Sequence, residues 1–249
     1  RYNAALQQLS VEEKNEWQRV YERTKQICEA ANKGDVGVLV DAEETWIQDP
    51  VDALTMILMG EYNKNKLVVY NTIQLYRHDR LGFLMNSYEA ARDNNFLLGA
   101  KLVRGAYMEK ERKRAKVKGY PSPIQPNKEA TDKDYDEAVR FCIDRLHHVG
   151  VMIATHNENS NLLGVRLLQQ KGLPLNHARV HFSQLYGMSD NISFNLAKAG
   201  CSVSKLLPFG PIEDVVPYLI RRAQENTSIG GQTSRELSLV KREMSRRRV

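Results

Sequence analysis

The sequence has few of the features that mark membrane, disulfide-rich or metal-binding proteins. No apolar run in the 249 residues approaches the roughly 20 residues needed to span a bilayer. The three cysteines, Cys28, Cys142 and Cys201, lie far apart and form no CxxC pair. Their spacing argues against a zinc site or a disulfide framework and is typical of a reducing compartment. No GxGxxG follows any apolar run, which weakens an open dinucleotide-binding sheet.

The sequence also lacks an initiating methionine and a signal-peptide pattern, and it opens with "RYNAALQQLS". We therefore expect a piece of a longer protein, in which the missing targeting segment has no significance. Hydrophobic residues make up 42% and charged residues 27%, which is ordinary for a soluble globular protein. A chain of this length can bury one large core, so we expect residues 1–249 to form a single domain.

The formal charge is +6, and most of the excess comes from "EKERKRAKVK" (109–118) and "KREMSRRRV" (241–249). A basic surface can attract nucleic acid or anionic lipid. The first of these segments alternates in sign at its start, which favours a solvated helix. A non-enzymatic scaffold that binds nucleic acid is therefore the remote alternative to an enzyme.

Short apolar runs alternate with longer helical patterns along the chain. Ser10 and Glu13 form a capping box that opens a helix to about residue 32. We predict strands at 36–41, 67–72, 97–105, 151–156, 178–184 and 202–208. Helices are expected from Pro50 as a first-turn residue, over 80–93, from 107, from a Thr131 cap, over 159–172 and 191–200, after the last strand, and from about 234.

Six strands that each precede a helix predict a parallel sheet, either open and doubly wound or closed into a (β/α)8 barrel. Because no glycine-rich dinucleotide motif is present, we favour the barrel. A barrel has eight strands, so we expect its first two strands to lie upstream of Arg1.

Polar residues stand at the carboxyl end of five of these strands. They are Asp41 with Glu43 and Glu44, then Gln74, then Lys101, Arg104 and Tyr107, then His156 and Asn157, and finally Gln184 and Tyr186. In a barrel they would gather at one rim, where this fold builds active sites. Each also has a structural interpretation: Asp41 as a helix cap, His156 as a loop histidine, and Arg104 as the partner of a carboxylate. Five strands ending in this way favour an active site.

The chemistry of such a rim is limited by its residues. No histidine and carboxylate pair has metal-ligand spacing, and no serine or cysteine lies in a nucleophile elbow. The lysine, arginine, amide and histidine side chains suit an anionic substrate and an organic cofactor that carries the difficult step. The adjacent Arg221 and Arg222 are either the start of a charged helix face or a pair of guanidiniums that close on one anion.

These motifs resemble the proline dehydrogenase family of flavin-dependent (β/α)8 barrels. The resemblance rests on "VDAEE", "KLVRGAYMEKER", "ATHNE", "QLYGMSD" and "PYLIRRAQEN", which occur in the family's order along almost the whole chain. It is similar to the stand-alone members rather than to the long bacterial fusions. The resemblance implies oxidation of L-proline to Δ1-pyrroline-5-carboxylate, by hydride transfer from proline C5 to N5 of FAD. It also implies that the last barrel helix lies over the barrel mouth.

The resemblance also implies roles for particular residues. Arg221 and Arg222 would bind the proline carboxylate, and Asp41 would organise the site beneath the flavin. Residues expected around the proline ring are Tyr107, Leu185, Leu206 and Tyr218. Residues expected to contact FAD are Gln74, Lys101, Val103, Arg104, Gly105, Ala106, Thr131, His156, Asn157 and Glu225.

Partners and compartment follow from the same resemblance. A membrane quinone would reoxidise the flavin, which implies peripheral membrane contact and no nucleic-acid partner. The expected location is the cytoplasmic face of a bacterial membrane, with the matrix side of the mitochondrial inner membrane as the alternative.

Three positions depart from the family's pattern. The family's substrate-binding lysine on an early strand would precede Arg1. Leu206 stands where a tyrosine usually lines the proline pocket, which favours hydroxyproline as an alternative substrate. Met108 stands where fused members often carry tryptophan, and we expect it to alter only packing at the flavin edge.

Overall fold

The protein is built on one parallel sheet whose six strands lie in sequence order. The computed structural model describes residues 7–228 and 232–247, except for the side chains of residue 221 and of residues 223–236. The strands are β1 (Val38–Val40), β2 (Val69–Gln74), β3 (Leu98–Val103), β4 (Val149–Ala154), β5 (Val180–Leu185) and β6 (Val203–Leu206). Parallel strands that lie in sequence order and are joined by helical crossovers are the arrangement of a (β/α)8 barrel. The six strands here form an open part of such a barrel, which we call a half-barrel.

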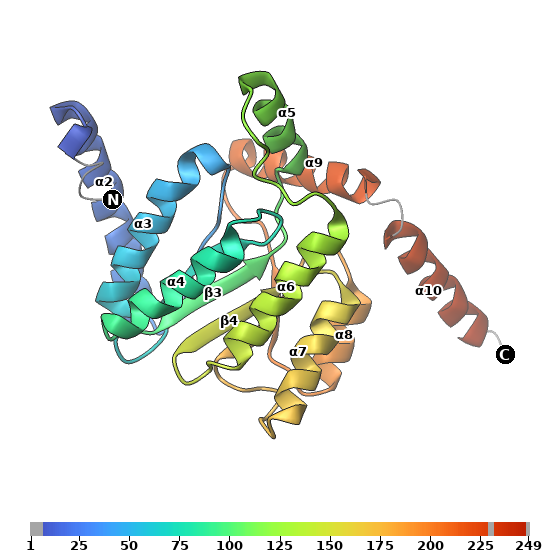
Figure 1. Ribbon diagram of the computed structural model, residues 1–249. Coiled ribbons are helices and arrows are strands. Elements are labelled where there is room, and N and C mark those ends of the chain that lie inside the picture. Colours follow the sequence, from blue (N-terminus) through green and yellow to red (C-terminus); the bar gives the residue numbers. More distant parts are fainter. Residues whose placement is uncertain (1–6, 229–231, 248–249) are drawn as a thin grey trace.

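Helices follow every strand. They are α3 (Thr45–Tyr62), α4 (Arg80–Asp93), α5 (Met108–Lys118), α6 (Lys128–Ile143), α7 (Glu158–Gln170), α8 (Asp190–Lys198) and α9 (Ile212–Ser228), with α2 (Val11–Lys33) before β1 and α10 (Gln232–Arg247) at the end. Figure 1 shows α3, α4, α6, α7 and α8 on one face of the sheet, and α9 beyond the carboxyl ends of the strands. All six predicted strands are confirmed within a few residues, whereas closure into an eight-stranded barrel stays a prediction.

Two predicted helix starts were wrong. Helix α3 begins at Thr45, so Pro50 lies inside the helix rather than in its first turn. The start is fixed instead by Glu111 of α5, whose carboxylate accepts hydrogen bonds from the Thr45 N–H (2.7 Å) and hydroxyl (2.8 Å). Helix α6 is capped by Asn127, whose side chain accepts from the Ala130 N–H, one turn before Thr131.

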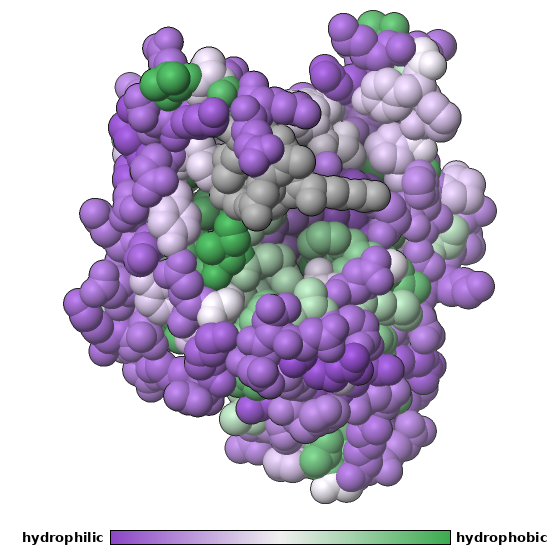
Figure 2. Space-filling model, turned by 60° about the vertical axis from the view of Figure 1, so that its left-hand side comes forward, coloured by the Kyte–Doolittle hydropathy of each residue, from purple (hydrophilic) through white to green (hydrophobic). Residues whose placement is uncertain are grey.

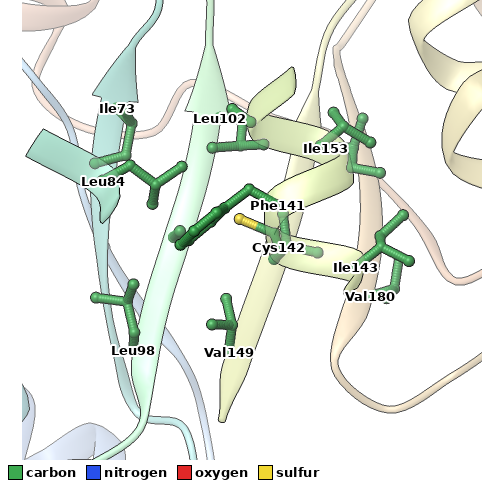
Figure 3. Packing of buried hydrophobic residues seen from close by; sticks show 14 of the residues in the cluster. Ile73, Leu84, Leu98, Leu102, Phe141, Cys142, Ile143, Val149, Ile153 and Val180 are labelled. Atoms are coloured by element: carbon green, nitrogen blue, oxygen red, sulfur yellow. The ribbon is translucent and has the colours of Figure 1, made fainter. Parts of the chain in front are cut away.

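The core lies between the sheet and its helices. On β3, β4 and β5, alternate residues such as Leu102, Ile153 and Phe182 are fully buried. Figure 3 shows Phe141 and Cys142 of α6 lying over β3 and β4. Each side chain of this size contributes about 1.5–3 kcal/mol when it is fully buried. We call this side of the sheet the helix face.

The opposite side, which we call the inner face, carries the other half of the alternation. Thr72, Lys101 and Met152 occupy one level of it, because they are register partners across β2, β3 and β4. Gly99 lies below Lys101 on this face, where an added Cβ would stand 2.3 Å from the Val69 carbonyl and 2.9 Å from the Tyr70 ring. The inner face is thus closely packed near its base and polar toward the carboxyl ends of the strands.

Candidate active site

An ion pair on the inner face joins the loop after β1 to β3, across the intervening strand β2. Lys101 Nζ lies 2.5 Å from Asp41 Oδ1, and the Thr72 hydroxyl lies 3.4 Å from the same oxygen. The Lys101 side chain is 10% exposed, whereas that of Asp41 is 59% exposed. The structure therefore brings two predicted site residues together and leaves the carboxylate accessible to a ligand.

Gln74 ends β2 on the same face, directly beside its register partner Val103. Its side chain is 2% exposed, and its Oε1 accepts no hydrogen bond from the residues that the structure describes. An unsatisfied buried acceptor costs about 1–3 kcal/mol. A ligand that donates to this oxygen would remove the cost.

The turn after β3 positions Tyr107. Gly105 has φ 136°, and an added Cβ there would lie 2.5 Å from the Tyr76 ring. Only glycine adopts this conformation so close to a neighbour without strain. Ala106 is exposed, and the Tyr107 hydroxyl donates to Glu43 Oε2 at 2.5 Å. The role of Glu43 could not be read from the sequence beyond its place in an acidic run.

Arg104 points to the helices that cover the sheet. Its guanidinium donates to Asp132 (2.7 Å), Thr155 (2.7 Å) and Ser160 (3.0 Å) and stacks 4.3 Å from the Tyr135 ring centroid. These contacts match its structural interpretation as the partner of a carboxylate. Thr131 lies in the first turn of α6 and is buried, and its hydroxyl donates to the Asn127 carbonyl at 3.3 Å. Their predicted contacts with the cofactor stay predictions.

His156 lies at the rim between β4 and β5. Its Nδ1 is 2.9 Å from the Ser189 hydroxyl. Burial, followed by the positive charges of Lys205 and Arg222, lowers its pKa from 6.5 to about 4. The imidazole is therefore neutral near pH 7. The adjacent Asn157 caps α7 by accepting from the Ser160 N–H at 3.2 Å.

The last strands and α9 bring the remaining predicted residues to the same end of the sheet. Leu185 and Leu206 are register partners on β5 and β6, and Leu206 is 38% exposed. On α9 the Arg222 guanidinium lies 5.1 Å from the Tyr218 ring centroid, and its charge acts on His156. The side chains of Arg221 and Glu225 lie outside the described residues, so their assignments remain predictions.

Figure 2, which brings the side of α2 and α3 forward, shows apolar side chains gathered in a hollow with hydrophilic ones around it.

Within the described part of the chain, no cluster of three or more His, Cys, Asp or Glu residues could hold a metal ion. None of the described helices is long and apolar enough to cross a membrane. The three cysteines are free and buried, and burial raises the pKa of Cys142 to about 12.

Parallel β/α units with polar side chains at the carboxyl ends of the strands define a half-barrel of the class that builds active sites at this rim. The comparisons with known proteins identify the family. The proline dehydrogenase family model matches residues 2–235, and the chain belongs to this family.

Three relatives illustrate the similarity. Mitochondrial proline dehydrogenase 1 of Caenorhabditis elegans is 40% identical over 97% of this chain, which covers 40% of that protein. The Homo sapiens protein of the same name is 39% identical over 97% of the chain, which covers 41% of it. A hydroxyproline dehydrogenase of Xenopus laevis is 38% identical over 98% of the chain, which covers 53% of it. The chain thus spans about two-fifths to one-half of the length of these relatives.

The fold has a solved counterpart. The crystal structure of proline utilization A from Bdellovibrio bacteriovorus, inactivated by N-propargylglycine, matches with a TM-score of 0.80 at 23% identity. The match covers 87% of this chain and 22% of that one. At this level of identity the similarity establishes the half-barrel fold and nothing finer.

Proposed function

We propose that this chain carries the catalytic face of an enzyme that oxidises L-proline to Δ1-pyrroline-5-carboxylate with FAD as the electron acceptor. The single observation that carries the proposal is the grouping of Asp41, Lys101 and Gln74 on the inner face of a proline dehydrogenase family half-barrel. A lysine, an exposed carboxylate and an unsatisfied amide oxygen are polar groups that a flavin ring can use.

The residues present fit a flavin. Its ring system offers N–H donors and carbonyl acceptors, which match the Gln74 oxygen and the Lys101 ammonium group. When bound, the flavin supplies the hydride acceptor. Lys101 and Gln74 would hold the ring, and Asp41 would orient the Lys101 ammonium group through their ion pair. Val103, Gly105, Ala106 and Asn157 are the further proposed contacts, together with Arg104, Thr131 and Glu225.

The substrate would be held from the α9 side. Arg222, with Arg221 beside it in the sequence, would bind the carboxylate and so fix the orientation of the ring. Leu185, Leu206, Tyr107 and Tyr218 would pack around the ring and exclude water. His156 is neutral at pH 7, so the positive charge that attracts the substrate carboxylate comes from the arginine pair. Its proposed role is a hydrogen bond to the cofactor.

Hydroxyproline is the second candidate substrate. Leu206 on β6 faces the same side as Leu185 and is 38% exposed, so this wall of the pocket is apolar and accessible. The similarity to a hydroxyproline dehydrogenase of Xenopus laevis is nearly equal to that to the proline dehydrogenases. We place proline first because most of the relatives named here are proline dehydrogenases.

Steady-state oxidation of L-proline, trans-4-hydroxy-L-proline and D-proline with an artificial electron acceptor tests these assignments. Turnover of L-proline with little turnover of D-proline is expected. Preference for the hydroxylated substrate would favour the second candidate, and turnover of neither L-amino acid by FAD-loaded chain would contradict both.

We further propose that electrons pass to a membrane quinone and that α5 faces the lipid surface. Helix α5 projects from the body (Figure 1) and buries only Glu111 and Ala115. Lys113, Lys116 and Lys118 are exposed on it, and Val117 is 74% exposed. Trp46 at the start of α3, 39% exposed, lies beneath Lys110 and Arg114. Exposed cations around an apolar side chain suit an anionic membrane, which attracts each with about 1 kcal/mol.

The relatives named mitochondrial favour a mitochondrial location over the bacterial one, and we propose the matrix side of the inner membrane. Co-sedimentation with anionic vesicles tests the surface: Lys113→Gln/Lys116→Gln/Lys118→Gln should lose binding, whereas the matched change Lys14→Gln/Arg19→Gln/Arg23→Gln on α2 should not. Equal loss in both variants would overturn the assignment. Binding to duplex DNA but not to vesicles would favour the nucleic-acid scaffold.

A further inference from the structure

A carboxylate is buried on the helix face, away from the proposed site. Asp52 of α3 is 4% exposed and accepts three hydrogen bonds from three elements. Gln48 of α3 (2.9 Å) and Asn71 of β2 (2.8 Å) donate to its Oδ1, and Arg80 of α4 donates to its Oδ2 at 2.8 Å. Arg80 is 2% exposed and stacks 3.8 Å from the Phe83 ring centroid. A charge buried to this extent requires such partners.

This carboxylate dictates the orientation of the Gln48 side chain. An ionised carboxylate only accepts hydrogen bonds, so Gln48 must turn its NH2 group toward Asp52. Its Oε1 then points the other way and accepts the backbone N–H of Glu43 at 2.8 Å. Gln48 is fully buried, which leaves water no access to replace either bond. A flipped amide would lose both hydrogen bonds.

The chain of contacts continues from Glu43 into the proposed site. The Glu43 carboxylate accepts the Tyr107 hydroxyl at 2.5 Å, and Asp41 lies two residues before Glu43 in the same loop. The loop is also tied from the other side, because Glu44 forms an ion pair with Lys110 and Glu111 binds Thr45. Gln48 joins this loop to the buried Asp52–Arg80 pair.

We infer that Gln48 is a positioning residue: held by the buried Asp52–Arg80 pair, it fixes Glu43 and through it the Tyr107 hydroxyl at the substrate. Its effect on turnover rests on the proposed function, whereas its effect on the Glu43 backbone does not. Because the Asp52–Arg80 pair lies on the helix face, Gln48 transmits the geometry of the core to the proposed site on the inner face.

A double-mutant cycle tests the link to Tyr107. Gln48→Met keeps the volume but removes both hydrogen bonds, and kcat/KM for L-proline should fall about 10-fold. Combined with Tyr107→Phe, it should cause no further loss, because both changes break the same chain. Multiplying effects would show that Gln48 acts independently of Tyr107 and would overturn the inference. Thr55→Val removes another buried polar group of α3, which donates to the Val51 carbonyl, and should leave kcat/KM unchanged.

Hydrogen exchange at the Glu43 amide tests the same chain without any turnover. Protection of this amide should fall by about 10-fold or more in Gln48→Met and stay unchanged in Thr55→Val. Wild-type protection of the Glu43 amide in Gln48→Met would overturn the inference. If the wild type oxidises no substrate, the proposed function fails while this measurement remains decisive.

Discussion

The two faces of the sheet differ in what their side chains contact, although they are formed by the same strands. Leu102 points into the core between the sheet and its helices, and Lys101 beside it points to Asp41 on the inner face. One residue along β3 therefore separates a packing role from a chemical one. Because successive side chains alternate between faces, we expect that stability and the proposed activity can be changed almost independently on each strand.

The largest expected effect comes from the inner face. Lys101→Met removes the ammonium group but keeps the length of the side chain, and we expect kcat/KM for L-proline to fall by about 100-fold or more. The free energy of unfolding should change little, because the Asp41 side chain is 59% exposed and water can solvate its carboxylate once Lys101 is gone. Steady-state kinetics and urea unfolding of the same preparation check both expectations. A large loss of stability with intact kinetics would reverse the assignment of the two faces.

The neighbouring position should behave in the opposite way. Leu102 is fully buried on the helix face, so Leu102→Ala should lower the free energy of unfolding by about 3 kcal/mol. The kcat/KM of the folded variant should remain within a few-fold of the wild type. Unfolding by urea measures the first effect. A loss of turnover comparable with that of Lys101→Met, in protein shown to be folded, would contradict the separation.

The pH dependence of stability sharpens the comparison at the rim. The pKa of His156 falls from 6.5 to about 4 on folding, because of burial and the nearby positive charges. Between these values the unfolded chain binds a proton that the folded chain does not, so stability falls as pH falls from 6.5 toward 4. The slope from this group is about 1.4 kcal/mol per pH unit.

The difference between wild type and His156→Gln, measured by urea unfolding at several pH values, isolates this contribution. The wild type should lose stability on acidification faster than the variant. Parallel curves would mean that the folded state does not disfavour the protonated imidazole.

The smallest effect concerns the choice of substrate. Leu206→Tyr adds a hydroxyl to an apolar wall of the inner face, and it should raise the preference for L-proline over trans-4-hydroxy-L-proline by about 10-fold. The measurement is the ratio of the two kcat/KM values on one preparation. An unchanged ratio would show that Leu206 does not contribute to substrate choice. The free energy of unfolding should barely change, because Leu206 is already partly exposed.

Much of the fold could be predicted because the apolar runs are short, β-branched and separated by helical patterns. All six strands follow from that alternation, and the carboxyl ends of parallel strands necessarily meet at one edge. The meeting of Asp41 with Lys101 is a consequence of this topology. The rim could therefore be predicted from the sequence for those residues whose side chains obey the alternation of a strand.

The parts that could not be predicted depend on contacts between distant segments. Arg104, two residues after Leu102, lies on the helix face by strand alternation, but no local pattern indicates that its partner is Asp132 on α6. Asn127 and Thr131 are both good caps one turn apart, and only the folded loop selects Asn127. Gln48 and Asp52 lie four residues apart inside α3, a spacing equally typical of an exposed helix face. Only the folded structure shows that both are buried and that Asp52 pairs with Arg80 of α4.

We propose above all that proline held at the inner face of this half-barrel reduces a bound flavin. The most direct test is the visible absorbance of the FAD-loaded chain during anaerobic addition of L-proline, with trans-4-hydroxy-L-proline added to a second sample. We expect the oxidised flavin bands to disappear with L-proline and Lys101→Met to slow this step. A bound flavin whose spectrum neither amino acid changes would contradict it.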